Sequence, residues 1–248
     1  MSSTAGQDKK FAFEHEKRRV YWHPLESNPE ALTECIRRLG VSPTWAFTDI
    51  YGLDPELLAF VPRPVKAVIL LFPITENYEK FRKEEQERLS APGANPVDPS
   101  IWYTSQTIGN ACGSIAVLHS LANNRDEISI EKGPLTSFYE KGVNLSAKER
   151  ALQLEEDQDL ASAFKLAAES GDTETPAADA PLDLHFVALV RGKDGHLYEL
   201  DGRKSTGAIN HGPCDDLLEG SAKLAKLFMA RDPENVQFNL IALTPSGE

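Results

Sequence analysis

The residues best suited to chemistry lie in one short stretch, Gln-Thr-Ile-Gly-Asn-Ala-Cys-Gly-Ser at positions 106–114. Within it, Cys112 stands where a helix is predicted to begin, and the positive end of a helix dipole favours the thiolate, the reactive form of cysteine. The side-chain amide of Gln106, just upstream, can donate a hydrogen bond to an oxygen that gains charge during acyl transfer. The stretch therefore predicts a nucleophile and an oxyanion donor.

A base and an orienting acid follow later in the chain. His185 stands at the head of an apolar, strand-like run, and Asp201 precedes Gly202. An imidazole that removes the thiol proton and a carboxylate that orients the imidazole complete the set needed for thiol-based hydrolysis. Taken singly, each residue has a plainer interpretation, namely a small buried cysteine, a core histidine and a turn aspartate. The combination is what predicts a cysteine hydrolase.

The remaining histidines and cysteines are weaker candidates. His119 follows Cys112 on the same predicted helix, roughly 10 Å further along its axis, and is too distant to act as its base. His211 is a weaker base candidate, and Cys35 and Cys214 are expected to be structural. Three widely spaced cysteines disfavour a disulfide framework and a zinc site, so no metal or other cofactor is expected. A free catalytic thiol predicts a reducing compartment, the cytoplasm and as a further site the nucleus.

The composition limits the classes of protein to be considered. With 248 residues, 41% of them hydrophobic and 26% charged, the chain is expected to form one soluble globular domain, or at most two small ones. No apolar run approaches the roughly 20 residues that a membrane-spanning helix needs, so a membrane is not an expected partner. The net charge of -12 disfavours nucleic acid as a partner and suits a basic one.

The pattern of apolar residues predicts an α/β (α+β) mixture, with helices around a strand core assembled largely from the C-terminal half. The first helix has the clearest start, because Asn28 is a favoured N-cap and Pro29 suits the first helical position. It is expected to close at Gly40. Strands are expected at residues 20–22, 66–72, 184–191, 196–199 and 238–243, and further helices at 54–61, 78–89, 112–123, 135–141, 147–168 (broken near Asp157) and 214–231.

Two segments differ from this pattern. Residues 1–19 are polar and charged and are predicted to be a flexible extension, which leaves residues 20–248 as the folded domain. Residues 163–182 are rich in small, acidic and proline residues and end shortly before His185. A long loop at this place is predicted to be mobile and to serve as a lid, a binding loop or a disordered insert.

Six motifs stand in order along nearly the whole chain, from Trp22 to Leu243. They are Trp-His-Pro-Leu-Glu-Ser-Asn-Pro at 22–29, Asp-Ile-Tyr-Gly-Leu-Asp at 49–54, Val-Pro-Arg-Pro at 61–64, Gln-Thr-Ile-Gly-Asn-Ala-Cys-Gly at 106–113, Leu-His-Phe at 184–186 and Glu-Leu-Asp-Gly-Arg at 199–203. In order and sequence they resemble the ubiquitin C-terminal hydrolase family, the cysteine deubiquitinases of the peptidase C12 type. Because the chain stops at Glu248, we expect the short, single-domain branch.

The resemblance implies roles for the four residues already singled out. It makes Cys112 the nucleophile, His185 the general base and later the proton donor, Asp201 the residue that orients the histidine, and Gln106 the donor that stabilises the oxyanion. It also implies a papain-like fold with a central, mostly antiparallel sheet flanked by helices. The loop before His185 then corresponds to the family's crossover loop, which straddles the active site.

The resemblance also implies partners. The family recognises ubiquitin and, in some members, the related modifier Nedd8; a monomer without cofactors is expected. Glu26 and Asp49 occupy family positions that contact the basic C-terminal tail of ubiquitin. The residues themselves leave another interpretation open, because each is equally suited to be a solvated carboxylate at the start of a helix or turn. The role of residues 1–19 is not implied by the resemblance.

The predicted function is thiol-dependent hydrolysis of the bond after the C-terminal glycine of ubiquitin, through a cysteine thioester. A loop of about 20 residues has a contour of ~70 Å and, closed into a circle, spans ~22 Å, whereas a folded domain of about 76 residues measures ~29 Å across. Small adducts, short peptides and unfolded tails are therefore the expected leaving groups. The alternatives are a Nedd8-selective enzyme, another cysteine hydrolase such as a general peptidase, and a non-catalytic ubiquitin-binding protein.

Overall fold

A six-stranded sheet runs through the middle of the structure, and all neighbouring strands are antiparallel. The structure is a computed structural model that describes residues 20–247, so the predicted extension at residues 1–19 lies outside the described residues. The spatial order of the strands is β1-β6-β2-β3-β4-β5. Their bounds are β1 (Trp45–Asp49), β2 (Ala67–Pro73), β3 (Leu184–Arg191), β4 (His196–Leu200), β5 (Ile209–Pro213) and β6 (Asn239–Pro245).

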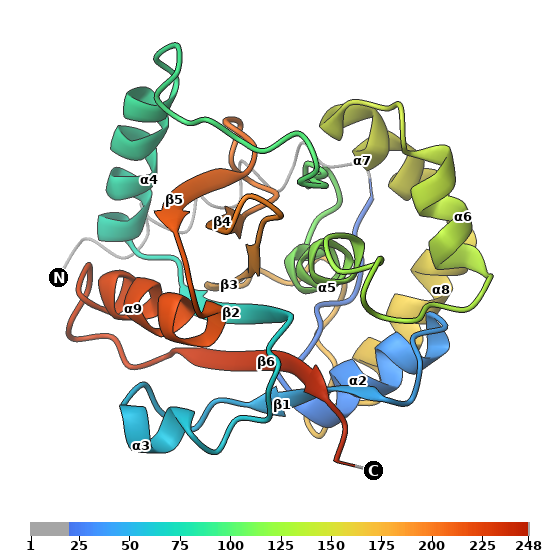
Figure 1. The fold of residues 1–248 in the computed structure, drawn as a ribbon. Coiled ribbons are helices and arrows are strands. Elements are labelled where there is room, and N and C mark those ends of the chain that lie inside the picture. Colours follow the sequence, from blue (N-terminus) through green and yellow to red (C-terminus); the bar gives the residue numbers. More distant parts are fainter. Residues whose placement is uncertain (1–19, 248) are drawn as a thin grey trace, which may run out of the picture.

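Helices cover both faces of the sheet, because its central strands are apolar on both sides. In β2, Ala67 and Ile69 pack into one buried cluster, whereas Val68, Leu70 and Phe72 pack into the other. Helices α2 (Pro29–Arg38), α5 (Cys112–Ala122), α6 (Pro134–Lys141), α7 (Ala147–Glu156) and α8 (Gln158–Ala168) contribute to the first cluster, and α3 (Pro55–Leu58), α4 (Glu76–Leu89) and α9 (Leu217–Met229) to the second (Figure 1). None of the helices in the described range is long and apolar enough to cross a membrane.

The predicted α+β class with a mostly antiparallel sheet is confirmed, and local signals explain where several helices begin. The Asn28 side chain accepts hydrogen bonds from the backbone N–H groups of Glu30 and Ala31, as expected of an N-cap before Pro29. The predicted break near Asp157 is also present. Asp157 ends α7 and caps α8, its side chain accepting from the N–H of Leu160.

One predicted strand needs correction, and two strands were not predicted. The predicted strand at residues 20–22 is reduced to a single parallel bridge between Tyr21 and Gly109. Strands β1 and β5 were not predicted, and both lie at the edges of the sheet. β5 contains Asn, His and Gly and has no alternating apolar pattern, so only its pairing with β4 makes it a strand. β1 is likewise defined by its register with β6.

The long loop before β3 is shorter than predicted. Residues 163–168 were predicted both as the end of a helix and as the start of this loop, and they belong to α8. Phe164 and Ala167 are buried at helical spacing, and Phe164 stacks on Trp22 with ring centroids 5.4 Å apart. This packing outweighs the loop-like composition. The connection between α8 and β3 is therefore residues 169–183, which we call the crossover segment.

Candidate active site

Helix α5 places Cys112 at its first position, at the end of the helix where backbone N–H groups have no intrahelical partner. Every residue of α5 is buried, which fixes the helix inside the molecule against β2 and β3. Gly113 allows this close packing, since a Cβ there would lie 3.1 Å from Leu25 and 3.3 Å from Phe186. The thiol is thereby held beside the start of β3, which carries His185.

Cys112, His185 and Asp201 form a continuous chain of contacts. His185 is 2% exposed, and its Nε2 lies 2.7 Å from Oδ1 of the completely buried Asp201. The Cys112 thiol makes a side-chain hydrogen bond with the same imidazole. An aspartate that holds one ring nitrogen orients the other toward the sulfur, which is the arrangement a thiol nucleophile needs.

The ionisation of these three groups follows from their burial and their contacts. Burial alone would raise the pKa of Cys112, but the hydrogen bond and charge of His185, followed by the backbone N–H groups of Phe186 and Gly113, lower it. Burial alone would lower the pKa of His185, but the charge and hydrogen bond of Asp201, and then Cys112, raise it to about 9. These contacts therefore favour the thiolate form of Cys112 and the imidazolium form of His185.

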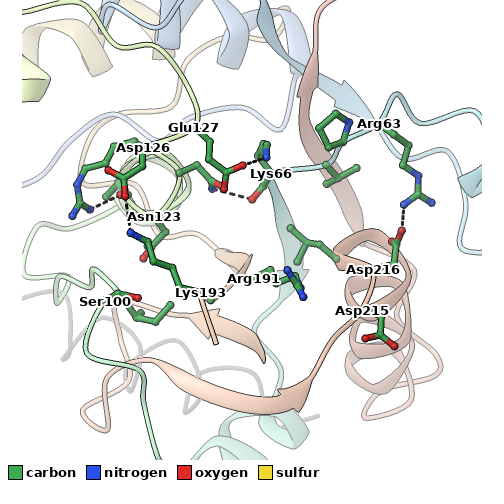
Figure 2. A pocket seen from close by; sticks show the side chains of 18 residues that line it. Arg63, Lys66, Ser100, Asn123, Asp126, Glu127, Arg191, Lys193, Asp215 and Asp216 are labelled. Atoms are coloured by element: carbon green, nitrogen blue, oxygen red, sulfur yellow. Dashed lines mark hydrogen bonds and ion pairs between the residues drawn. The ribbon is translucent and has the colours of Figure 1, made fainter. Parts of the chain in front are cut away.

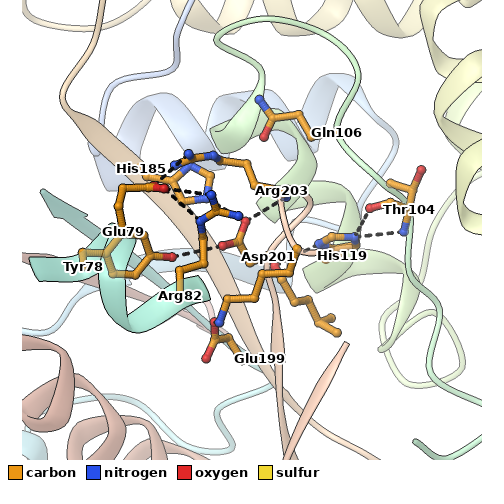
Figure 3. A network of polar contacts seen from close by, with 12 residues as sticks. Tyr78, Glu79, Arg82, Thr104, Gln106, His119, His185, Glu199, Asp201 and Arg203 are labelled. Carbon is orange, nitrogen blue, oxygen red and sulfur yellow. Dashed lines mark hydrogen bonds and ion pairs between the residues drawn. The ribbon is translucent and has the colours of Figure 1, made fainter. Parts of the chain in front are cut away.

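Asp201 keeps its negative charge in spite of complete burial. Burial opposes ionisation, but the charge and hydrogen bond of His185, and then the charges of Lys204 and Arg203, hold the pKa of Asp201 well below its usual range. The Arg203 backbone N–H donates to Oδ1 at 2.9 Å, and the hydroxyl of Tyr78 donates to Oδ2 at 3.2 Å. Figure 3 shows these groups converging on the carboxylate from different elements.

Gln106 is tied to the same region through the backbone. Its N–H donates to the carbonyl of Gly202 at 2.8 Å, and a Cβ at Gly202 would lie 2.9 Å from the Gln106 Cβ. Its Nε2 donates to the carbonyl of Ile108 at 3.1 Å, while its Oε1 is buried without a hydrogen-bond partner in the described part of the chain. Because an amide nitrogen carries two hydrogens, this bond orients the amide and leaves one N–H for an oxyanion.

Cys112 lines a cleft of about 540 Å³ that residues of the crossover segment also line. Glu26 lines the same cleft, and its Oε2 accepts from the backbone N–H of Thr173 at 3.2 Å and from its hydroxyl at 3.1 Å. Asn110, two residues before Cys112, donates through Nδ2 to the carbonyls of Ala178 and Ala180 at 2.8 and 2.7 Å. The crossover segment is thus fastened at both sides of the cleft.

Asp49 is not brought to this cleft. It is the last residue of β1, paired with Ile241, and its Oδ1 is buried without a hydrogen-bond partner among the residues described. Of the two predicted ubiquitin contacts, only Glu26 therefore lies beside Cys112. Sequence reasoning also missed Tyr78 and Asn110. Asn110 lies within the motif at 106–113 and adopts a left-handed backbone with φ of 55°, whereas Tyr78 lies in a charged helix outside every motif.

A larger cleft of about 610 Å³ lies at the opposite end of α5 and contains none of the predicted site residues (Figure 2). Its charged side chains are largely paired with one another, as in Lys193 with Asp126 at 2.7 Å and Lys66 with Glu127. Two predicted site residues, Cys112 and Glu26, line the smaller cleft instead. No group of three or more His, Cys, Asp or Glu side chains in residues 20–247 is arranged to hold a metal ion.

Comparison with known proteins agrees with this geometry. The family model described as "Ubiquitin carboxyl-terminal hydrolase, family 1" matches residues 22–230. A ubiquitin carboxyl-terminal hydrolase of Drosophila melanogaster is 47% identical, with 92% of this chain and 99% of that protein aligned. Isozyme L1 of Sus scrofa is 39% identical, with 89% and 96% aligned.

A solved structure has a similar fold. The catalytic domain of Trichinella spiralis UCH37, solved with ubiquitin vinyl methyl ester bound, superposes with a TM-score of 0.72 at 23% identity, over 92% of this chain and 98% of that one. The match to the family model and the identity to curated relatives both extend over most of the chain. This chain therefore belongs to family 1 of the ubiquitin carboxyl-terminal hydrolases, the cysteine-type deubiquitinases.

Proposed function

We propose that this chain hydrolyses the bond after the C-terminal glycine of ubiquitin, with Cys112 as nucleophile. The observation that carries the proposal is the unbroken contact from the Cys112 thiol through His185 to Asp201, with Cys112 lining a cleft of about 540 Å³. Gln106 and the backbone N–H of Cys112, at the free end of α5, would stabilise the oxyanion.

The reaction proceeds in two halves. The Cys112 thiolate attacks the carbonyl carbon of the terminal glycine, and the tetrahedral oxyanion collapses with cleavage of the carbon–nitrogen bond while the His185 imidazolium gives its proton to the leaving amine. His185 is then neutral and removes a proton from water, which attacks the thioester. The carbon–sulfur bond breaks, ubiquitin leaves as a carboxylic acid that releases its proton to solvent, and the proton taken by His185 restores the thiolate–imidazolium pair.

The crossover segment limits the size of the leaving group. It comprises about 15 residues between α8 and β3, with a contour of ~51 Å and a diameter of ~16 Å if closed into a circle. An α-helix measures about 10–12 Å across and a folded domain of 76 residues about 29 Å. Small adducts, short peptides and unfolded tails are accordingly the leaving groups that we propose.

Glu26 is the acidic group that we propose to receive the basic tail of ubiquitin, because it lines the cleft beside Cys112. In the free chain its carboxylate is bonded to Thr173 of the crossover segment, so engagement of a basic tail competes with this contact. For Asp49 the proposal has weaker support, since its carboxylate does not line the cleft. Parallel assays with ubiquitin and Nedd8 adducts decide between the two modifiers.

A reducing compartment, the cytoplasm or nucleus, is proposed from the same chemistry. All three cysteines are free thiols, and the nucleophile is among them. Oxidation of Cys112 would remove the thiolate on which the mechanism depends.

The decisive experiment measures hydrolysis of a fluorogenic C-terminal amide of ubiquitin by the wild type and by Cys112→Ala. We expect the substitution to reduce kcat by about 10⁴-fold or more, as for other nucleophiles that act as a unit with their base. Near-normal turnover by Cys112→Ala would refute the assignment of the nucleophile. Binding of ubiquitin without turnover by the wild type would identify a non-catalytic ubiquitin-binding protein instead.

A further inference from the structure

The two carboxylate oxygens of Asp201 are held differently. Oδ1 accepts two hydrogen bonds, from His185 Nε2 at 2.7 Å and from the Arg203 backbone N–H at 2.9 Å. The hydrogen bonds of the described residues give Oδ2 one donor, the Tyr78 hydroxyl at 3.2 Å (Figure 3). The orientation of this buried carboxylate therefore depends on Tyr78, which is not one of the three proposed catalytic residues.

Tyr78 is itself fixed by its surroundings. Its backbone N–H donates to the Thr75 hydroxyl at 3.2 Å, which caps α4 and sets the first turn from which the side chain points. Its ring lies against Phe72, with centroids 4.7 Å apart, and against Phe228, with centroids 6.2 Å apart. Phe72 in turn meets the His185 ring edge-on. The hydroxyl therefore has little freedom to leave Asp201.

We propose that Tyr78 is a positioning residue for the thiol chemistry, because its hydroxyl holds Oδ2 and so keeps Oδ1 of Asp201 on His185 and His185 on Cys112. The inference deepens the proposed function and rests on it for the role of His185. Tyr78 touches neither the sulfur nor the expected substrate, so its effect is transmitted through the carboxylate.

The physical reason is the rotation of a carboxylate about its bond to the chain. Donors on both oxygens define the plane of the group, whereas donors on one oxygen alone do not. A buried oxygen that loses its donor is strongly unfavourable, so the carboxylate would turn toward another positive group. Lys204 and Arg203 are the cations whose charges act on Asp201. Such a turn weakens the bond to His185 and, with it, the pair with Cys112.

The hydroxyl remains a donor throughout the working range of pH. Burial, followed by the charges of Asp201 and Glu199, raises the pKa of Tyr78 well above its ordinary value, while Arg203 and Arg231 act in the opposite direction. The titratable and charged groups that face this contact are His185 of β3, Glu199 of β4, Asp201, Arg203 and Lys204 of the loop that follows, and Arg231 after α9; Cys112 of α5 faces His185.

The test uses Tyr78→Phe, which keeps the ring and removes only the hydroxyl. The rate of alkylation of Cys112 by iodoacetamide, read by mass spectrometry of its peptide across pH, reports the pH at which the thiolate forms. We call this pH the alkylation edge and expect it to rise by about one unit in Tyr78→Phe. We also expect kcat to fall about tenfold at unchanged KM, in keeping with the loss of a hydrogen bond to a charged group.

Tyr103→Phe is the matched control. The Tyr103 hydroxyl is also buried beside Asp201, but it donates to the main-chain carbonyls of Asp201 and Lys204, at 2.7 and 3.0 Å, and not to the carboxylate. We expect Tyr103→Phe to lower Tm without moving the alkylation edge. An equal shift in both variants would mean general loosening around Asp201 and would overturn the proposal, as would a wild-type edge in Tyr78→Phe.

Two further results keep the test decisive. If Tyr78→Phe does not fold, Thr75→Ala, which removes the cap that places Tyr78, must move the edge upward, and an unchanged edge overturns the proposal. Alkylation needs no ubiquitin, so a shifted edge in a chain whose wild type does not hydrolyse ubiquitin amides would support the role of Tyr78 while refuting the proposed substrate.

Discussion

The support around Asp201 and the crossover segment are built in opposite ways, although both lie close to Cys112. Asp201 is completely buried and receives hydrogen bonds from three elements of the fold. The crossover segment is held chiefly by single side chains, most of them exposed, such as Asn28 on Asp172 and Glu26 on Thr173. Chemistry requires fixed geometry, whereas access of a peptide requires a segment that can move.

Asp201→Asn should have the largest effect, because it removes the buried charge that the surrounding hydrogen bonds hold in place. The variant keeps the shape of the side chain but removes its charge and the acceptor that selects the ring tautomer of His185. We expect kcat to fall by about 10³–10⁴-fold, as in other triads that lose this carboxylate. A loss below tenfold would show that Asp201 does not orient the base.

The same variant predicts a change in pH dependence. The charge of Asp201 is a main cause of the raised pKa of His185, so the imidazolium persists up to a pH of about 9 in the wild type and should be lost at lower pH in the variant. The alkaline limb of kcat/KM should therefore move toward neutral pH, and the acid limb, set by Cys112, should move up. Unchanged limbs would contradict the ion-pair assignment.

Lengthening the crossover segment should have the next largest effect, because it changes the other of the two regions compared. Fifteen added Gly and Ser residues near Ala177 would raise the contour to ~102 Å and the limiting diameter to ~32 Å, above the ~29 Å of a small folded domain. We expect at least a tenfold gain in cleavage of ubiquitin fused to a small folded domain, with little change for a fluorogenic amide. Equal rates for the fusion before and after insertion would show that the segment does not limit substrate size.

Asn110→Gly should have the smallest effect, and it tests how the two regions are joined. Glycine tolerates the left-handed backbone at this position, so the variant removes the two bonds to Ala178 and Ala180 without strain. We expect amide exchange in residues 169–183 to quicken about tenfold, from the loss of two hydrogen bonds of ordinary strength.

Asn28→Ser is the control for Asn110→Gly, because serine keeps the cap of α2 and removes only the exposed bond to Asp172. Its effect on exchange in the crossover segment should be about twofold or less, as expected of a solvent-exposed contact. If Asn28→Ser loosened the segment as much as Asn110→Gly, the buried Asn110 would not be the main anchor.

Much of the fold could be predicted because its signals are local. The cap at Asn28, the break at Asp157 and the apolar runs of β2 and β3 each act within a few residues, and the corresponding elements are present. The edge strands could not be predicted, for two different reasons. The partner of β1 is β6, at the other end of the chain, whereas β5 pairs with the neighbouring β4 but has no alternating apolar pattern. The start of the crossover segment was placed too early because the packing of Phe164 on Trp22 is a tertiary contact.

The candidate site shows the same division between local signals and tertiary contacts. The sequence by itself determined the residue types, namely a cysteine at a helix start, a histidine at a strand start, an aspartate and a glutamine, because dipoles and motifs are properties of neighbouring residues. Only the tertiary structure decided that Tyr78 of a charged surface helix supports Asp201, that Asn110 anchors residues 169–183, and that Asp49 stays away from the cleft. These contacts join residues from distant parts of the chain, and burial, which gives each its strength, exists only once the chain has folded.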